Sequence, residues 1–405
     1  MTQTASVSTP PSAASSSRNF VPLFVGLAIM LGLFLFWTFK IGIPHGLIDR
    51  TDFRSTYAAG VLERTHPSQL FSLDAQQQVQ TTRISPGQFT LPFFHPAYEA
   101  LLFVPFSLLP YPAAYAAFAI FNVALIAACM IAGFRVVFVV IPFLQPRPGM
   151  LAFFFLPLWL AVLQGQDSIL FLLLLILAWN QLDDGDELRA GLLLAAALFK
   201  FQIALPLALL LAIRQGGRFV KGFLLGALAV AALSFACSPQ APARFIGLIR
   251  GSALAGTRQG GPGYQGYIFP QQMANLRGLF FALFGGHLSA RSLMLVTLSA
   301  SVLLLAFVAL RMRRVENDLL AFAAALMACM LTSYHLYPHD LSPLLLPIAA
   351  IAVAQRLLKR TLLFVLYLAP LVCFFGLSPD SLYLVSLPVL AAAGAIFFPR
   401  PHPSA

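Results

Sequence analysis

Two carboxylates three residues apart are the first candidates for chemistry. Asp49 and Asp52 lie in the polar sequence IDRTDFRSTYAAG, together with Arg54 and Tyr57, directly after an apolar run. A carboxylate at a membrane surface can remove a proton from a sugar hydroxyl if its geometry and pKa suit that role. Alternatively, Asp52 caps a helix that begins near Phe53, because an Asp oxygen can accept hydrogen bonds from the first helical turn. The sequence leaves both interpretations open.

Four further polar groups interrupt the apolar runs, where polar residues are costly and often functional. They are Gln164, Gln166 and Asp167 in LQGQDS; Lys200 in ALFKFQIALP; Asn275 and Arg277 in a loop rich in Gly and Gln; and His335, His339 and Asp340 in TSYHLYPHDLSP. These side chains could bind a sugar or a phosphate. The structural alternatives are polar turns, helix caps, a flexible loop, and a lysine that extends to the membrane surface.

No metal or other cofactor is expected. His335 and His339 have the i,i+4 spacing that could bind a metal on a helix, but Pro338 interrupts such a helix and no further ligand cluster is evident. The sequence contains no P-loop, GxSxG, CxxC or dinucleotide fingerprint. The four cysteines lie in or beside apolar runs, as small packing residues do.

The composition indicates an integral membrane protein. Of the 405 residues, 59% are hydrophobic and 10% are charged, whereas about 25% are charged in soluble domains. The net charge of +11 does not indicate nucleic acid as a partner, because the basic residues cluster at the ends of apolar runs, as cytoplasmic loops do. These clusters are Arg214, Arg218 and Lys221; Arg311, Arg313 and Arg314; and Arg356, Lys359 and Arg360. The bilayer itself is therefore the first partner.

The run of apolar segments predicts an all-α polytopic membrane protein, a bundle of about 11–13 transmembrane helices with short helices in the first outer loop. Residues 1–19 are expected to be a disordered cytoplasmic tail, 20–399 a single membrane domain, and 400–405 a second cytoplasmic tail. The outer loops are expected at 41–95 and 238–276. Predicted crossings include Ala97–Leu109, Pro112–Phe134 and a short one within Arg135–Pro146. With the N-terminus in the cytoplasm, this count places all five polar groups on the outer face.

The chain resembles glycosyltransferase family 87, membrane enzymes of the GT-C fold class. The resemblance runs from about Phe20 to Pro347 and rests on segments in family order. These are DFRSTYAAG from Asp52, FHPAYEALLFVPFSLLP from Phe94, LQGQDSILFLLL from Leu163, GLLLAAALFKFQIALPL from Gly191 and SYHLYPHDLSPLLLP from Ser333.

This resemblance implies an inverting transfer of a sugar, often mannose, from a polyprenyl phosphate to a glycolipid or glycan acceptor on the outer face of the plasma (inner) membrane. It implies Asp52 as the general base, with Lys200, Arg277 and His335 near the donor phosphate. Gln166 is expected to contact the substrate. Two rivals remain, a transporter or flippase for a lipid-linked glycan and a non-catalytic scaffold for envelope assembly. A transporter requires polar residues along a whole path through the membrane, and here they gather at one end.

Overall fold

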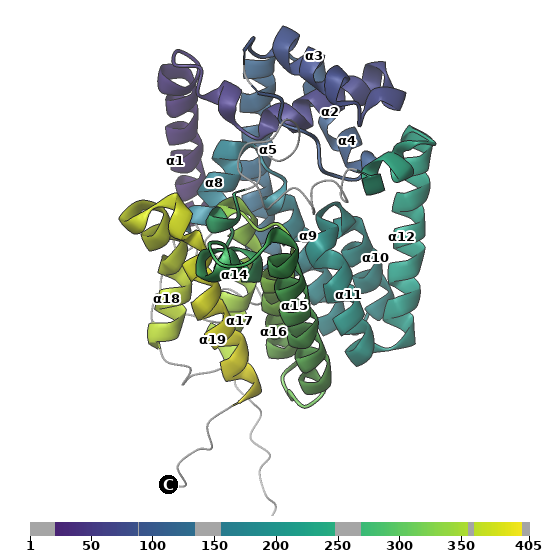
Figure 1. Ribbon diagram of the computed structural model, residues 1–405, viewed down its shortest axis with the longest axis vertical. Coiled ribbons are helices and arrows are strands. Elements are labelled where there is room, and N and C mark those ends of the chain that lie inside the picture. The colour runs from purple at the N-terminus through teal and green to yellow at the C-terminus, as the bar shows by residue number, and fades with distance from the viewer. Residues whose placement is uncertain (1–20, 88, 134–154, 248–268, 355–359, 399–405) are drawn as a thin grey trace, which may run out of the picture.

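The computed structural model describes residues 21–87, 89–133, 155–247, 269–354 and 360–398, and every regular element among them is helical (Figure 1). The two predicted tails and the predicted crossing within Arg135–Pro146 lie outside the described residues. We call the end of the bundle that carries α2, α3 and α4 the upper end, which is the top of Figure 1, and the opposite end the lower end.

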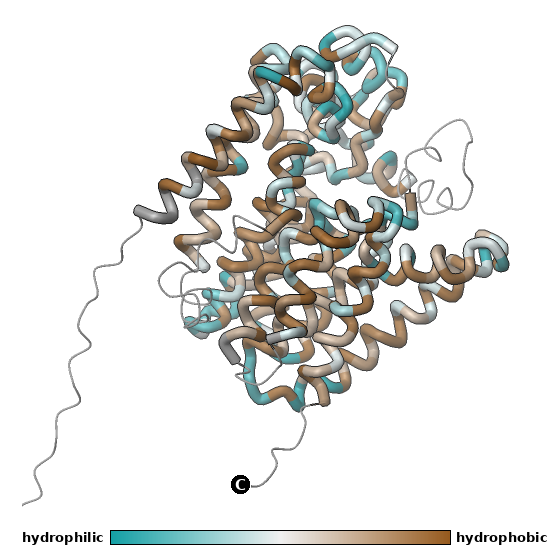
Figure 2. The backbone as a smooth tube through the Cα atoms, turned by 90° about the vertical axis from the view of Figure 1, so that its left-hand side faces the viewer, coloured by the Kyte–Doolittle hydropathy of each residue, from teal (hydrophilic) through white to brown (hydrophobic). Residues whose placement is uncertain are grey.

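The helices confirm an all-α polytopic membrane protein. Five helical stretches are long and apolar enough to cross a membrane by length and composition: Tyr111–Ala132, Glu187–Gln215, Gly217–Cys237, Ala290–Met312 and Pro379–Phe397. Shorter apolar helices pack among them. Figure 2 shows hydrophobic residues along the bundle and hydrophilic residues gathered at its ends.

Three short helices form the upper layer. They are α2 (Phe53–Thr65), α3 (Leu73–Arg83) and α4 (Ala97–Phe103). Ser72 caps α3, as its hydroxyl oxygen accepts a hydrogen bond from the Ala75 amide. The predicted crossing at Ala97–Leu109 is wrong, because α4 ends after seven residues, which rise about 10 Å against a hydrocarbon core of about 30 Å.

Helices α5 (Tyr111–Ala132) and α9 (Ser168–Asp183) connect the two ends of the bundle. At the upper end the Tyr111 hydroxyl donates to the Ile48 carbonyl oxygen at 2.8 Å. At the lower end the Asn180 side chain donates to the Ala132 carbonyl oxygen at 2.9 Å. Helix α8 (Leu156–Gln164) lies between them in the chain and returns it to the upper end, where α9 begins.

The stretch Glu187–Gln215 is a hairpin and not one long crossing. A straight helix of 29 residues would be about 43 Å long. However, Gly222, just after this stretch, packs directly on the backbone of Leu188 near its beginning. The chain therefore rises in α10 (Glu187–Ala196), reverses at a short 3-10 helix (Ala197–Lys200) and descends in α11 (Phe201–Gln215). This reversal places Lys200 at the upper end.

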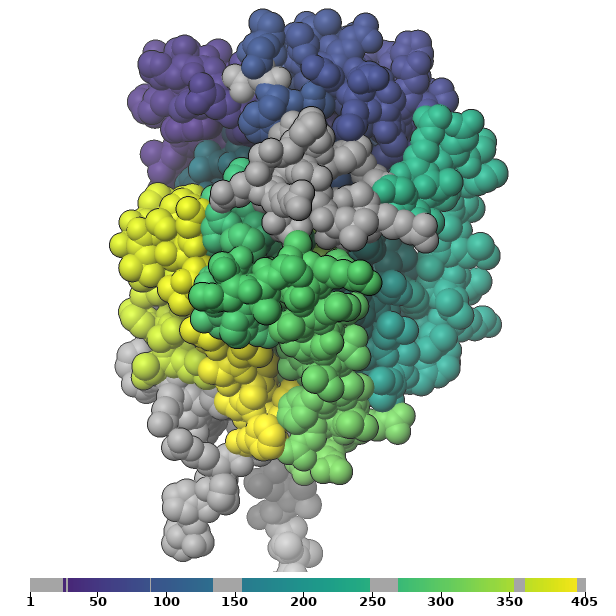
Figure 3. Space-filling view, viewed as in Figure 1, coloured from purple at the N-terminus to yellow at the C-terminus, as the bar shows by residue number. Residues whose placement is uncertain are grey.

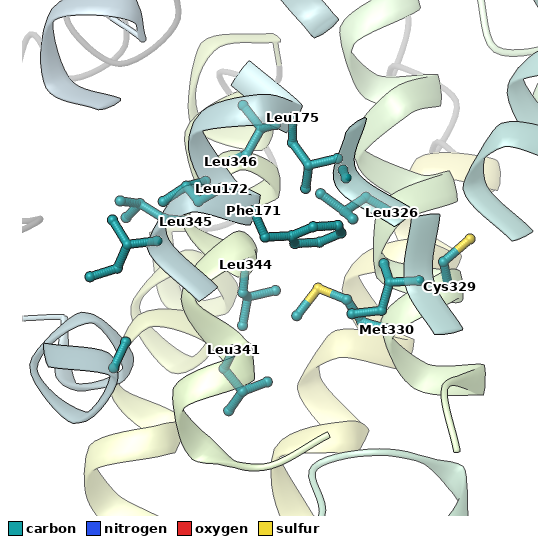
Figure 4. Packing of buried hydrophobic residues seen from close by; sticks show 14 of the residues in the cluster. Phe171, Leu172, Leu175, Leu326, Cys329, Met330, Leu341, Leu344, Leu345 and Leu346 are labelled. Atoms are coloured by element: carbon teal, nitrogen blue, oxygen red, sulfur yellow. The ribbon is translucent and has the colours of Figure 1, made fainter. Parts of the chain in front are cut away.

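The remaining helices complete the bundle. They are α1 (Val21–Trp37), α12 (Gly217–Cys237), α14 (Leu276–Phe284), α15 (Ala290–Met312), α16 (Asp318–Thr332), α17 (Leu345–Ala354), α18 (Arg360–Leu371) and α19 (Ser386–Phe397). Helix α16 is central and almost wholly buried. Figure 4 shows Phe171 and Leu175 of α9 close to Leu326 and Met330 of α16.

Helices α10 and α12 approach closely because glycines line their contact. Gly222 and Gly226 lie one turn apart on α12, and Gly191 faces them from α10. A Cβ atom on Gly222 would lie 2.1 Å from the Leu188 carbonyl oxygen, which is closer than atoms can approach. Small residues allow this kind of helix packing in membranes, where lipid supplies no hydrophobic drive between helices.

We predict that Gly222→Ala separates α10 from α12 and lowers the thermal stability of the purified protein, at a cost of about 1–3 kcal/mol. Gly217→Ala on the same helix is the matched control, because a Cβ atom there meets nothing within 4 Å. Unfolding temperatures in one detergent measure the difference. Equal unfolding temperatures for the two variants would contradict the packing described here.

Candidate active site

A single cavity at the upper end collects side chains from segments far apart in the sequence. It encloses about 860 Å³, its open mouth included. Its lining consists of Asp52, Ser55, Leu91, Pro92, Phe94, His95, Gln166, Phe199, Lys200, Gln202, Tyr334, His335, Tyr337, His339 and Asp340. Figure 3 shows the upper layer, purple to blue, above the teal helices that reach it on the right. Asp52, Gln166, Lys200 and His335, predicted separately, thus face one space.

Asp52 precedes α2 but does not cap it. Its side chain makes no hydrogen bond to the first turn of α2, in contrast to Ser72 before α3. Instead, its Oδ2 atom accepts a hydrogen bond of 2.8 Å from the Gln166 amide. Its backbone N–H donates to the Gln164 side-chain oxygen at 3.2 Å. The turn between α8 and α9 therefore holds this carboxylate toward the cavity, where 32% of its side chain is exposed.

Lys200 is the charged centre of the cavity wall. Its Nζ atom lies 2.8 Å from Asp167 Oδ1 and 2.8 Å from Asp340 Oδ1, and all three side chains are at least 96% buried. Ser168 donates a further hydrogen bond of 3.1 Å to Asp340 Oδ1. Although burial acts to raise it, the ammonium group lowers the pKa of Asp167 to about 2. Lys200 is thus matched by two carboxylates before any substrate binds.

His339 joins Asp340 to Asp52. Its Nε2 atom lies 3.4 Å from Asp340 Oδ2, and its Nδ1 atom lies 3.9 Å from Asp52 Oδ2. Burial would lower the pKa of His339, but Asp340 and then Asp52 outweigh burial and raise it. His335 differs, because burial lowers its pKa to about 3 and keeps its imidazole neutral near pH 7. One histidine can therefore carry charge beside Asp52, whereas the other offers a neutral ring.

Arg277 and Asn275 do not line the cavity but hold the segment that does. The Arg277 guanidinium donates to the Tyr334 carbonyl oxygen at 2.9 Å, and the Asn275 amide donates to the Ser333 carbonyl oxygen at 2.8 Å. Asn275 also caps α14, since its side-chain oxygen accepts from the Gly278 N–H. Both residues therefore position the backbone that carries His335.

The other predicted residues of the first polar segment lie away from the cavity lining. The Arg54 guanidinium donates to the Asp49 carbonyl oxygen at 3.4 Å and stacks on the Phe89 ring. The Tyr57 hydroxyl donates to the Leu109 carbonyl oxygen at 2.9 Å. Among these residues, only Asp52 faces the cavity. The predicted second loop, 238–276, falls largely outside the described residues, including Arg258, Tyr264 and Tyr267.

His95 and Glu99 were not predicted from the sequence, and they extend the network of polar side chains around Asp167. His95 lines the cavity, and its Nδ1 atom lies 2.7 Å from Glu99 Oε2 and 3.7 Å from Asp167 Oδ2. Burial and the neighbouring Asp167 raise the pKa of Glu99 well above its usual range. The sequence does contain one indication of this pair, because His95 and Glu99 have i,i+4 spacing at the start of an apolar run. Ligand atoms of His95, Glu99 and Asp167 lie within 4.8 Å of one another and could hold a metal ion.

The described helices thus form a membrane bundle with a polar cavity at its upper end. The model of glycosyltransferase family 87 matches residues 93–338, which is more than half of the chain. The chain belongs to this family and is a membrane glycosyltransferase. No curated protein and no solved structure matches it.

The matched range contains Gln166, Lys200, Arg277 and His335 but not Asp52. It is therefore shorter than the resemblance from Phe20 to Pro347 described above. The connection of Asp52 to the matched segment comes from the structure, through its hydrogen bonds to Gln164 and Gln166.

We predict that Lys200→Met destabilises the protein by about 3–5 kcal/mol, because it leaves Asp167 and Asp340 buried without their cation. Unfolding temperature and the monodisperse fraction after detergent extraction measure this loss. Lys221→Met, on the exposed surface of α12, is the control and should behave as wild type. Adding Asp167→Asn and Asp340→Asn to Lys200→Met should recover part of the stability. A stable single variant would show that the ion pairs contribute little.

Proposed function

We propose that this glycosyltransferase moves a hexose, with mannose as the expected sugar, from a polyprenyl phosphate to a hydroxyl of a glycolipid or glycan. The observation that carries the proposal is the Asp52 carboxylate, which faces the shared cavity and makes no capping bond to α2. A carboxylate placed in this way can accept a proton from a bound hydroxyl.

The proposed reaction is a direct displacement at the anomeric carbon. Asp52 takes the proton of the acceptor hydroxyl as the oxygen attacks the anomeric carbon. The bond from that carbon to the phosphate oxygen breaks on the opposite face, so the configuration inverts. The electron pair leaves with the polyprenyl phosphate. Gln166 holds the carboxylate at 2.8 Å, and His339 offers a second hydrogen-bonding group close to it.

The donor phosphate would lie toward Lys200 and His335. Both line the cavity, on the side formed by the turn between α10 and α11 and by the segment before the 3-10 helix Pro338–Leu344. Arg277 would contribute indirectly, because it holds the Tyr334 backbone. Since phosphate is already a good leaving group, positioning and electrostatic stabilisation can supply much of the catalysis.

The cavity would open on the outer face of the plasma (inner) membrane. Arg214 lies at the lower end of α11, where its guanidinium donates to the Met312 carbonyl oxygen beside Arg311 and Arg313. Basic residues at one end of a bundle favour the cytoplasmic side. The upper end would then face outward, with the N-terminus in the cytoplasm and the lipid-linked donor entering from the bilayer.

We predict that Asp52→Asn lowers the rate of sugar transfer by about 10²–10⁴-fold, because an amide cannot accept the proton. Purified protein is incubated with a panel of polyprenyl-phosphate sugars and membrane lipids, and mass spectrometry detects the glycosylated product. Asp74→Asn, an exposed carboxylate at the start of α3, is the matched control and should retain full transfer.

Two results would contradict the proposal. Wild-type transfer by Asp52→Asn would remove Asp52 as the base. If wild-type protein transfers none of the sugars and deletion of its gene leaves envelope glycans unchanged, the enzyme proposal itself fails. A flippase predicts movement of a lipid-linked glycan across vesicle membranes without a change in its mass.

A further inference from the structure

The wall of the cavity holds more carboxylates than cations. Asp52 and Asp340 line the cavity, Asp167 contacts Lys200 directly behind it, and Glu99 contacts His95. Among the described residues that line the cavity or touch these carboxylates, Lys200 is the only Lys or Arg that forms an ion pair with them. A donor that carries a phosphate would therefore approach a wall in which acidic groups outnumber the fixed cation.

The region around His95 is where this excess of carboxylates is least compensated. Asp167 Oδ1 is compensated by Lys200 at 2.8 Å. Both Glu99 oxygens, Asp167 Oδ2 and His95 Nδ1 are buried and make no aligned hydrogen bond within the described part of the chain. Only 2% of the Glu99 side chain is exposed, and 1% of the Asp167 side chain. Buried carboxylates without a compensating charge or hydrogen bond are costly, and proteins usually pair them or use them as metal ligands.

The three ligand atoms are arranged around a common point. Lys200 occupies Asp167 Oδ1, whereas Asp167 Oδ2 points toward His95 Nδ1 at 3.7 Å. On its other side His95 Nδ1 lies 2.7 Å from Glu99 Oε2. A shared ion about 2.1 Å from each ligand atom requires these atoms to lie within about 4 Å of one another. The observed limit of 4.8 Å needs only a small side-chain movement.

We propose that His95, Glu99 and Asp167 bind one divalent cation of the Mn²⁺ or Zn²⁺ class beside the catalytic cavity. One imidazole and two carboxylates suit these ions, and the remaining coordination positions would take water or substrate oxygen. His95 lines the cavity and has a side chain that is 20% exposed, which gives an ion a route from the cavity.

The positive charge of Lys200 is already neutralised by Asp167 and Asp340. The cation would supply additional positive charge beside the cavity. It would reduce the repulsion between the cavity wall and an anionic donor and would favour the departing phosphate. This role toward the donor rests on the proposed function, whereas the binding of the ion does not.

Metal binding is measured directly on the full-length protein in lipid nanodiscs, after removal of bound metal with EDTA. Electron paramagnetic resonance of free Mn²⁺ gives the number and affinity of sites, and competition with Zn²⁺ compares the two ions. We expect one site per chain in the wild type and in Asp74→Asn. We expect at least a tenfold loss of affinity in Glu99→Gln, which preserves the shape of the side chain.

His95→Asn is the second variant, in case Glu99→Gln does not yield monodisperse protein. The site is disproved if folded wild type binds neither Mn²⁺ nor Zn²⁺ at about 1 mM free metal, which is the affinity range of weak cation sites. Absence of binding is the result expected if Glu99 and Asp167 share a proton instead of an ion. It is also disproved if the folded variants bind metal as wild type does.

Equal binding of polyprenyl phosphate with and without Mn²⁺ would overturn the link to the donor. None of these measurements depends on sugar transfer.

Discussion

The contact of Lys200 with Asp167 and Asp340 is the interaction on which the site depends. Taking three charges out of water costs several kcal/mol for each, so the arrangement persists only because each charge has close partners. These partners come from the turn between α8 and α9, the reversal between α10 and α11, and the 3-10 helix before α17. The same α8–α9 turn carries Gln166, which fixes Asp52. The position of the proposed base therefore depends on an ion pair that it does not itself make.

The site combines rigid and open parts. The segment from Ser333 to Tyr337 is irregular, and the side chains of Asn275 and Arg277 hold the carbonyl oxygens of Ser333 and Tyr334 at its beginning. Irregular backbone at the end of a membrane bundle is tolerated where protein side chains or water satisfy its polar groups. Two side chains that look like substrate contacts from sequence thus serve to keep His335 and His339 in place.

Much of the fold followed from the sequence, because long apolar runs and strong caps are local features. The predicted crossing Pro112–Phe134 agrees closely with α5, and the short helices predicted for the first outer loop are α2 and α3. The prediction of a crossing at Ala97–Leu109 was wrong, because its apolar residues form a short helix of the upper layer. His95 and Glu99 were missed because their partner Asp167 is distant in sequence. Only the folded bundle shows that Lys200 is paired with two carboxylates, since Asp340 lies 140 residues further on.

This separation has a consequence for biogenesis. Asp167 and Lys200 lie at the two upper ends of the hairpin formed by α9 and α10, so they can pair as soon as that hairpin enters the bilayer. Asp340 is synthesised 140 residues after Lys200 and arrives only once α16 is in place. During insertion, the early pair is electrically neutral, and the late carboxylate docks onto a lysine that is already anchored. The charged centre can therefore be complete only after α16 has been synthesised, when α17, α18 and α19 are still to follow.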